Sequence, residues 1–332
     1  MGSSSSQNLA RVFAAAALYV LSGSTQPLLM TLVKQSGLGD PTCQIYMLFY
    51  YLGPALVSLS FCIPSSVRCS TDDSNNSRPA SRRPSRNALI KSAGIASIDI
   101  VAQAMNYTGS TFCGPTIFAI IYSSVTIWTA LFSRLLLHRT LTGIQWMGVC
   151  VVFCGLCITA WDSAALGPEV WKGAVLVFVG STVHAMTYVL SEAIMTKNTT
   201  NENASTDNHN NNEHDSSNDD NEQLGVTENC AVQGIVACLV YLTWQCIYTL
   251  PRFQERILQP AQQSGTSLTR ALLILGGIGG SNLVHALAFF YTLKCVPGGA
   301  TSAGVMKGLQ AVLVFVVTSV VYCDRSSEDG MG

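Results

Sequence analysis

Nine stretches of about twenty mostly apolar residues divide this chain of 332 residues, and they constrain its fold more than any other feature. A segment of that length and composition can cross the hydrocarbon core of a bilayer as an α-helix, which satisfies its own backbone polar groups. Only 11% of the residues are charged, and they gather in the connections between the apolar stretches, whereas a soluble domain usually carries about 25%. The sequence therefore predicts an all-α, polytopic transmembrane helix bundle. The predicted spans cover residues 10–33, 42–63, 88–108, 115–137, 141–161, 170–193, 230–250, 270–293 and 300–323.

Two long connections interrupt this pattern. Residues 64–87 are rich in Ser, Arg and Pro, and residues 197–229 are dominated by Asn, Asp and Glu. Both lack apolar periodicity, so we expect them to be disordered. His209 and His214 lie among acids in the second connection, but we expect a solvated linker there and no metal site. The net charge of −1 gives no indication of a nucleic-acid partner.

The sequence carries no convincing sign of an enzyme. The stretch GSTFCGPT (109–116) has the glycine spacing of a phosphate loop but has Pro115 where that loop requires lysine. We find no nucleophile beside a base and no metal or cofactor signature. Three cysteines share one face of the fifth span, and we interpret them as small apolar residues. They are Cys150, Cys154 and Cys157.

The distribution of basic residues predicts an orientation. With a cytosolic N-terminus, eleven of the eighteen Lys and Arg residues lie at cytosolic ends or loops, six lie on the far side and Lys307 lies within a span. The positive-inside rule favours that arrangement. It leaves the sequons at Asn75, Asn198 and Asn203 in the cytosol, so we expect them to carry no glycan.

An internal repeat is also visible. Residues 106–139 align without a gap over residues 290–323, and LSGSTQ (21–26) echoes FVGSTV (178–183). These echoes predict two halves, residues 1–163 with five spans and residues 164–332 with four. With an odd number of spans in the first half, the second half must be inverted in the membrane. Inverted repeats are typical of secondary transporters, which bind their substrate near the midplane between the halves.

The stretch PTIFAIIYSSVTIWTALFSRLLLHRTLTGIQWMGVCVVFCGLCITAW (115–161) resembles the drug/metabolite transporter superfamily of EamA-like proteins, in the solute carrier 35 branch of nucleotide-sugar transporters. The resemblance implies ten helices in two inverted five-helix halves with both termini cytosolic. Here the tenth helix is missing, because the chain after Tyr322 reads CDRSSEDGMG. The chain is then either truncated or a nine-span variant.

Polar residues inside the spans form stripes at helical spacing, which predicts either a cavity wall or hydrogen bonds between helices. The candidate substrate-binding residues are Tyr122, Thr126, His184, Tyr188, Tyr241, Gln245, Asn282, His285, Lys307 and Gln310. Asp99 and Gln103 of the third span are candidates for proton or ion coupling, although a structural pair of Asp99 with Lys307 would also explain the acid.

Lys307 is the most informative of these residues, because a charge inside hydrocarbon costs at least about 2.5–3.5 kcal/mol. It either snorkels to the interface or serves as an anion contact in a cavity near the N-terminus of its helix. AGVMK (303–307) lies where transporters of the GDP-mannose type carry a Gly-Ala-Leu-Asn-Lys motif, and the resemblance implies that Lys307 contacts phosphate.

The sequence thus predicts a secondary transporter of a small, anionic organic solute such as a nucleotide sugar, working by alternating access without a cofactor. A nucleotide-sugar substrate would place it in the Golgi or endoplasmic reticulum membrane, with the plasma membrane or a plastid as alternatives. Two other readings stay open, a metabolite or amine exporter that relies on Asp99 and a non-transporting membrane scaffold. The small-residue spacing of GGIGG (276–280) permits close helix approach and a homodimer.

Overall fold

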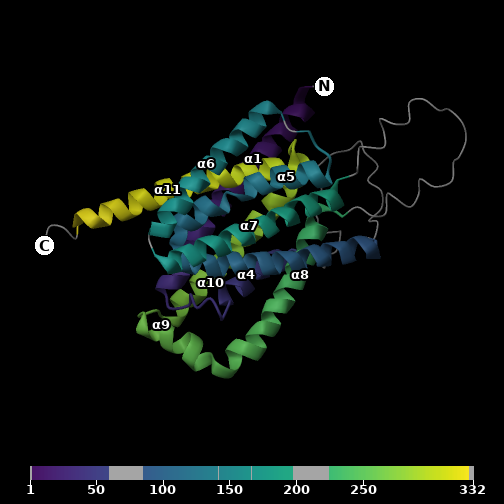
Figure 1. The fold of residues 1–332 in the computed structure, drawn as a ribbon. Helices are drawn as coiled ribbons and strands as arrows, with labels where there is room; N and C mark the ends of the chain where they lie inside the picture. The colour runs from purple at the N-terminus through teal and green to yellow at the C-terminus, as the bar shows by residue number, and fades with distance from the viewer. Residues whose placement is uncertain (1, 60–84, 141, 166, 197–223, 329–332) are drawn as a thin grey trace, which may run out of the picture.

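The computed structural model describes residues 2–59, 85–140, 142–165, 167–196 and 224–328. The predicted disordered connections, the three sequons, His209 and His214 lie largely or wholly outside these ranges. The described residues form a bundle of α-helices, as predicted (Figure 1). The helices are α1 (Gly2–Gln35), α2 (Ile45–Leu56), α4 (Arg86–Tyr122), α5 (Val125–Leu136), α6 (Gly143–Ala165), α7 (Pro168–Met195), α8 (Val226–Trp244), α9 (Gln259–Gln263), α10 (Leu268–Cys295) and α11 (Gly299–Glu328).

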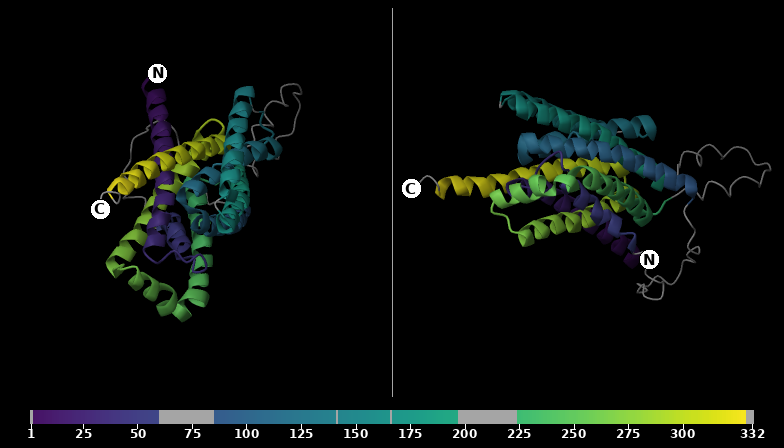
Figure 2. Two further views of the ribbon diagram at one scale, coloured as in Figure 1. Left: turned by 60° about the vertical axis from the view of Figure 1, so that its left-hand side comes forward. Right: turned by 90° about the horizontal axis from the view of Figure 1, so that it is seen from below.

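Among the described residues, six helices are long and apolar enough to span a membrane, namely α1, α4, α7, α8, α10 and α11. The helix α8 runs on through a π-helical turn, η4 (Gln245–Thr249), and a 3-10 turn, η5 (Leu250–Arg252). A second π-helical turn, η6 (Gln254–Leu258), leads into α9. The sequence placed a connection here, yet Figures 1 and 2 show a helical arm that projects from the bundle.

The boundary predicted at residue 108 between the third and fourth spans is wrong. The helix α4 continues through it and bends at Gly114, whose φ of 77° lies in the left-handed region that favours glycine. Gly109 lies within the helix, where it packs against Gly173 of α7, and the first non-helical residue of α4 is Gly114. Pro115 follows the bend, where its missing N–H interrupts no bond of the new helical segment. The fourth span is interrupted instead by a turn at Ser123 and Ser124.

The main helix contacts join one predicted half to the other: α1 with α10, α2 with α8, α4 with α7, and α5 with α11. If each helix is replaced by the helix at the same place in the other half, the same four pairs result. A two-fold relation between the halves requires this. The aligned glycines Gly114 and Gly298 also share a positive φ, 77° and 88°. These pairs have the pattern that an inverted repeat would produce, and both the repeat and its division at residue 163 stay predictions.

Glycines set the closest approach between two of these helices. A Cβ atom on Gly53 of α2 would collide with the carbonyl oxygen of Gly279 on α10. The prediction of close approach at GGIGG thus holds for Gly279, whereas Gly276, Gly277 and Gly280 face open space. Backbones that approach this closely gain dispersion contacts, the main driving force for helix association in lipid.

The connection between α1 and α2 closes one end of the bundle against α8. The side chains of Trp244 and Gln245 donate to the carbonyl oxygens of Thr42 and Cys43 over 3.0 and 2.6 Å. Burial alone would raise the pKa of Asp40 in this connection, but bonds from the Thr42 hydroxyl and N–H outweigh it and hold that pKa below its ordinary value. Asp40 therefore stays anionic and fixes the turn.

Polar contacts of α11 with α7 and α5 close the other end. Glu192, in the last turn of α7, accepts a bond from the Ala300 N–H over 2.7 Å and pairs with Arg139 over 2.5 Å. Its carboxylate lies where it complements the positive end of α11. The Thr126 hydroxyl donates to the Gly304 carbonyl over 2.6 Å, which ties α5 to α11.

Candidate functional site

Lys307 lies inside the bundle and not at its edge. Its side chain is only 4% exposed, and its Nζ lies 3.3 Å from His285 Nε2. The rings of Tyr19 and Tyr122 lie 5.2 and 5.3 Å from the same nitrogen, within the range of a cation–π interaction. This placement excludes snorkelling to the interface in this structure. No carboxylate forms an ion pair with Lys307 in the part of the chain that the structure describes.

The neighbours of His285 fix the direction of its bonds. The Ser22 hydroxyl donates to the Leu18 carbonyl over 2.5 Å, so at 3.0 Å it accepts from His285 Nδ1. The proton of the neutral ring is then on Nδ1, and Nε2 is left as an acceptor for the Lys307 amine. Tyr19 stacks on the imidazole at a centroid separation of 4.7 Å and holds it in place. The arrangement presents Lys307 as a donor.

Asp99 is the centre of a second cluster. The Tyr51 hydroxyl donates to its Oδ2 over 2.5 Å, and His184 Nδ1 lies 2.6 Å from its Oδ1. The structural pair of Asp99 with Lys307 that the sequence left open does not form, and the carboxylate bonds instead to Tyr51 and His184, with the Thr187 hydroxyl 3.5 Å from Oδ1. Gln103, one turn further along α4, places its amide nitrogen 3.3 Å from His184 Nε2. Both coupling candidates thus meet at one histidine.

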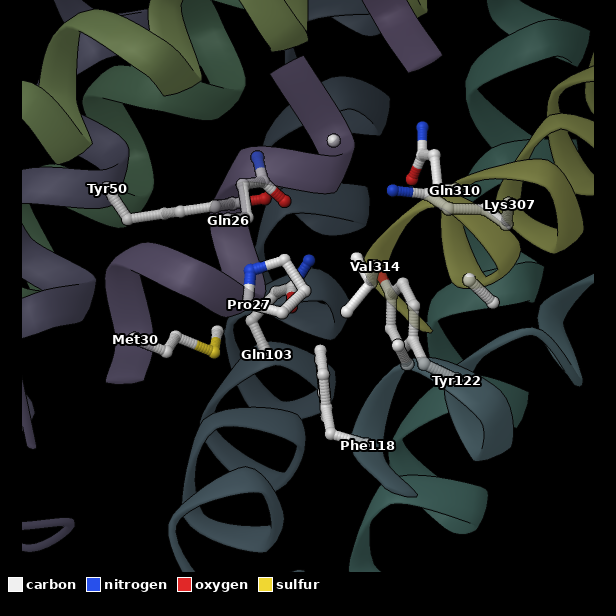
Figure 3. A pocket seen from close by; sticks show the side chains of 13 residues that line it. Gln26, Pro27, Met30, Tyr50, Gln103, Phe118, Tyr122, Lys307, Gln310 and Val314 are labelled. Carbon is white, nitrogen blue, oxygen red and sulfur yellow. The ribbon is translucent and has the colours of Figure 1, made fainter. Parts of the chain in front are cut away.

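Two small cavities bring the clusters together. The first lies between α1, α4 and α11, and Figure 3 shows Lys307 and Gln310 reaching into it from α11, opposite Gln26. The second extends toward α7, α8 and α10, with Asp99 among its wall residues. Three residues line both cavities, namely Tyr50, Gln103 and Lys307. Their free volumes of about 30 and 60 Å³ hold only a few waters, so a larger solute requires the walls to move.

Most predicted site residues line these cavities, namely Gln103, Tyr122, Lys307 and Gln310 in the first, and Asp99, His184, Tyr188, Asn282 and His285 in the second. Three do not. Thr126 bonds to α11, the Tyr241 hydroxyl donates to the Ile100 carbonyl, and Gln245 caps the α1–α2 connection. Of the two interpretations of the polar stripes, a cavity wall or hydrogen bonds between helices, these three residues fit the second.

The contribution of α1 and α2 to the site was not predicted from the sequence. Tyr19, Ser22 and Gln26 follow the same helical spacing as the stripes that were recognised, and they support His285 and Asn282. That stripe was available as a signal. Tyr50 and Tyr51 gave none, because adjacent aromatic residues in an apolar stretch look like ordinary core. Pro27 also contributes, since it cannot donate to the Gly23 carbonyl, and both residues line the first cavity.

The comparisons with known proteins now bear on this geometry. Residues 44–161 match the model of the EamA-like transporter family. The matched region includes Asp99, Gln103 and Tyr122 but ends far before Lys307. A comparison with curated proteins found no match.

The family match, together with the six long apolar helices, supports an integral, multi-pass membrane transporter of the drug/metabolite superfamily. Members of this family are transporters, which fits the expectation that the chain is not an enzyme. A transporter of this class binds a small-molecule solute and lies in a lipid bilayer.

Proposed function

We propose that the chain is a secondary transporter that moves a small, anionic organic solute by alternating access, with a nucleotide sugar as the leading candidate. The observation that carries the proposal is Lys307, a buried amine in the wall of both cavities with no carboxylate partner among the described residues. A desolvated cation without a counter-ion is costly, and an anionic solute would offset that cost when it binds.

The surroundings of Lys307 suit an organic anion better than a simple ion. Tyr122 offers an aromatic face beside the amine, Tyr50 offers another in the cavity wall, and Gln26 and Gln310 offer amide groups. Aromatic faces and amides are the groups that bind the ring and hydroxyl parts of a sugar or nucleotide. The ends of the bundle are closed in this structure, so loading requires one of them to open, as alternating access demands. A nucleotide-sugar substrate would place the protein in the Golgi or endoplasmic reticulum.

Counterflow in proteoliposomes tests the proposal. Vesicles preloaded with unlabelled nucleotides or phosphorylated metabolites are offered a panel of labelled nucleotide sugars and related anions. Saturable uptake by the native chain is expected. Lys307→Ala should lower the apparent affinity about ten- to hundredfold, because a hydrogen bond to a charged group contributes about 1.5–3 kcal/mol. Lys307→Arg should retain part of the native affinity.

Lys172→Ala is the matched control, because it removes an exposed lysine of α7 that pairs with Glu169 of the same helix. Equal uptake by the Lys307→Ala and Lys172→Ala variants would refute the role of Lys307. If the folded native chain carries no anion, the proposal fails.

A second candidate function rests on Asp99, the carboxylate in the wall of the second cavity. An exporter of amines would use this acid as its cation contact, with Tyr51 and Tyr188 as aromatic neighbours. The same vesicles distinguish the two functions. Export of amines that depends on Asp99 and ignores Lys307→Ala would favour the amine exporter, and no flux of either class would favour a scaffold.

A further inference from the structure

The cluster around Asp99 has a chemistry that the binding of an anion at Lys307 does not use. Its carboxylate receives two short bonds, from Tyr51 and from His184, and the His184 side chain is 9% exposed. The proton of that short bond is on His184 Nδ1, because a carboxylate can only accept. The other nitrogen, Nε2, faces the Gln103 amide and the cavity. His184 Nε2 is thus the atom that can take up a proton, beside the Asp99 carboxylate.

We propose that Asp99 and His184 form a proton-binding dyad that couples proton movement to the anion, so that the chain is a proton–anion symporter. This inference rests on the proposed function. In its unloaded state the dyad has a charge of −1, carried by Asp99. One proton taken up at His184 Nε2 turns the imidazole into an imidazolium, and the charge of the dyad becomes zero.

The charge balance of the cavity sets the direction of coupling. Before proton uptake, the dyad and the Lys307 ammonium sum to zero, so the site has no net attraction for an anion. After proton uptake the sum is +1, which attracts an anion, so that a monoanion brings the sum to zero and the doubly charged diphosphate of a nucleotide sugar brings it to −1 instead of −2. Proton and anion therefore favour each other's binding, and by linkage the effect is reciprocal. Both ligands should travel in the same direction.

Gln103 supplies a structural link between the two sites. When Nε2 is unprotonated, it accepts from the Gln103 amide nitrogen, which lies 3.3 Å away. When Nε2 carries a proton it becomes a donor, and the amide must turn over to present its oxygen. Gln103 lines both cavities together with Lys307, so this reorientation changes the wall of the anion site directly.

The other groups around the dyad do not take over this role. Tyr51, Tyr122 and Tyr188 contact the dyad or its ring, while Tyr50 and Cys230 line the same cavity and Tyr241 stacks on Tyr51. Phenols and thiols stay neutral where carboxylates and imidazoles titrate. His285 has both nitrogens engaged, and a proton on its Nε2 would face the Lys307 amine. Tyr19 bonds only to Tyr188 through its hydroxyl.

Two transport measurements on the same vesicles separate coupling from binding. Counterflow exchange needs no net proton movement, whereas accumulation driven by a pH gradient does. With the membrane potential held at zero, one-to-one symport should accumulate a monoanion about tenfold per unit of pH difference. Asp99→Asn removes the negative charge of the dyad permanently. This variant should therefore retain counterflow exchange and lose the accumulation driven by the pH gradient. His184→Gln should behave alike, and His138→Gln, which changes an exposed histidine, should behave as native.

A titration of the purified protein in lipid nanodiscs reads the proton site without any solute. Infrared difference spectra between alkaline and acidic buffer should contain an imidazole band that His184→Gln removes and His138→Gln leaves. Accumulation by native protein that ignores the pH gradient, or full accumulation by Asp99→Asn, would overturn the symport. If no anion is exchanged at all, the proposed function fails. The spectra test the proton site independently of transport. If His184→Gln loses no imidazole band, the proton site is refuted as well.

Discussion

At the scale of single residues, the site depends on the direction in which its donors and acceptors are arranged. The Lys307 amine donates to His285, which donates to Ser22, which donates to the backbone of α1. In this series of hydrogen bonds, the direction of each bond fixes the direction of the next. Asp99, in contrast, is surrounded by donors from Tyr51, His184 and, at 3.5 Å, Thr187. The two clusters share a cavity without forming an ion pair with each other.

Ser22→Ala tests the series of hydrogen bonds that runs from Lys307 to the backbone of α1. Without the hydroxyl, the His285 ring loses the acceptor that fixes its proton on Nδ1, so its Nε2 no longer stays an acceptor for Lys307. A hydrogen bond of this kind contributes about 0.5–1.5 kcal/mol. We expect the apparent affinity for the anion to fall about two- to tenfold in counterflow, with a smaller effect on the maximal rate.

Ser97→Ala is the matched control for that measurement. Ser97 lies on an exposed face of α4 and also bonds to a carbonyl one turn back. Its removal should leave the affinity unchanged. An unaltered affinity in Ser22→Ala would show that the His285 orientation does not depend on this hydroxyl.

At the scale of elements, glycine decides where helices meet. Gly53→Ala should destabilise the contact of α2 with α10, since the new Cβ meets the Gly279 carbonyl and the Leu283 N–H. Overpacking of this kind costs about 1–3 kcal/mol. The apparent melting temperature in detergent should therefore fall by several degrees. Gly280→Ala adds the same atom on α10 where no neighbour lies within 4 Å, and it should leave the melting temperature unchanged or raise it.

The sequence predicted the elements better than their ends. Length and apolarity located nearly every helix, because both are properties of the local chain. The sequence predicted a gap between residues 108 and 115 where α4 only bends at Gly114, since sequence shows that a residue tolerates a left-handed φ but not that the helix resumes at once. Lys307 and Asp99 were found because charge inside an apolar helix is rare. Tyr51, which donates to Asp99, and Ser22, which bonds to the His285 partner of Lys307, come from distant helices, and no local pattern assigns such contacts.

At the scale of the whole molecule, the contacts of Glu192 join the two predicted halves. The carboxylate bonds to the first turn of α11 and to Arg139, which follows α5. Gly299 has a φ of 44°, and a Cβ atom there would occupy the position of the Glu192 carboxylate. This junction must separate for that end of the bundle to open. It therefore contributes both to stability and to the free-energy difference between transport states.

Gly299→Ala should break this junction. The combination of a positive φ and a clash with a buried carboxylate costs about 1–3 kcal/mol, so we expect a lower melting temperature. We also expect faster labelling of a cysteine introduced at Thr301, which is buried behind the junction. Gly308→Ala, on the same helix and with no neighbour within 4 Å, is the control. Similar labelling in both variants would argue against a closing role for Glu192.

The position of Glu192 also has a consequence for biosynthesis. The partner of its second oxygen belongs to α11, the last helix that the structure describes, and so do the partners of Thr126 and His285. While the ribosome is still making α11, the earlier helices already lie in the membrane with these polar groups unmatched. The insertion machinery must hold that intermediate until α11 arrives. Chains stalled before residue 299 should be recognised by membrane quality control and degraded.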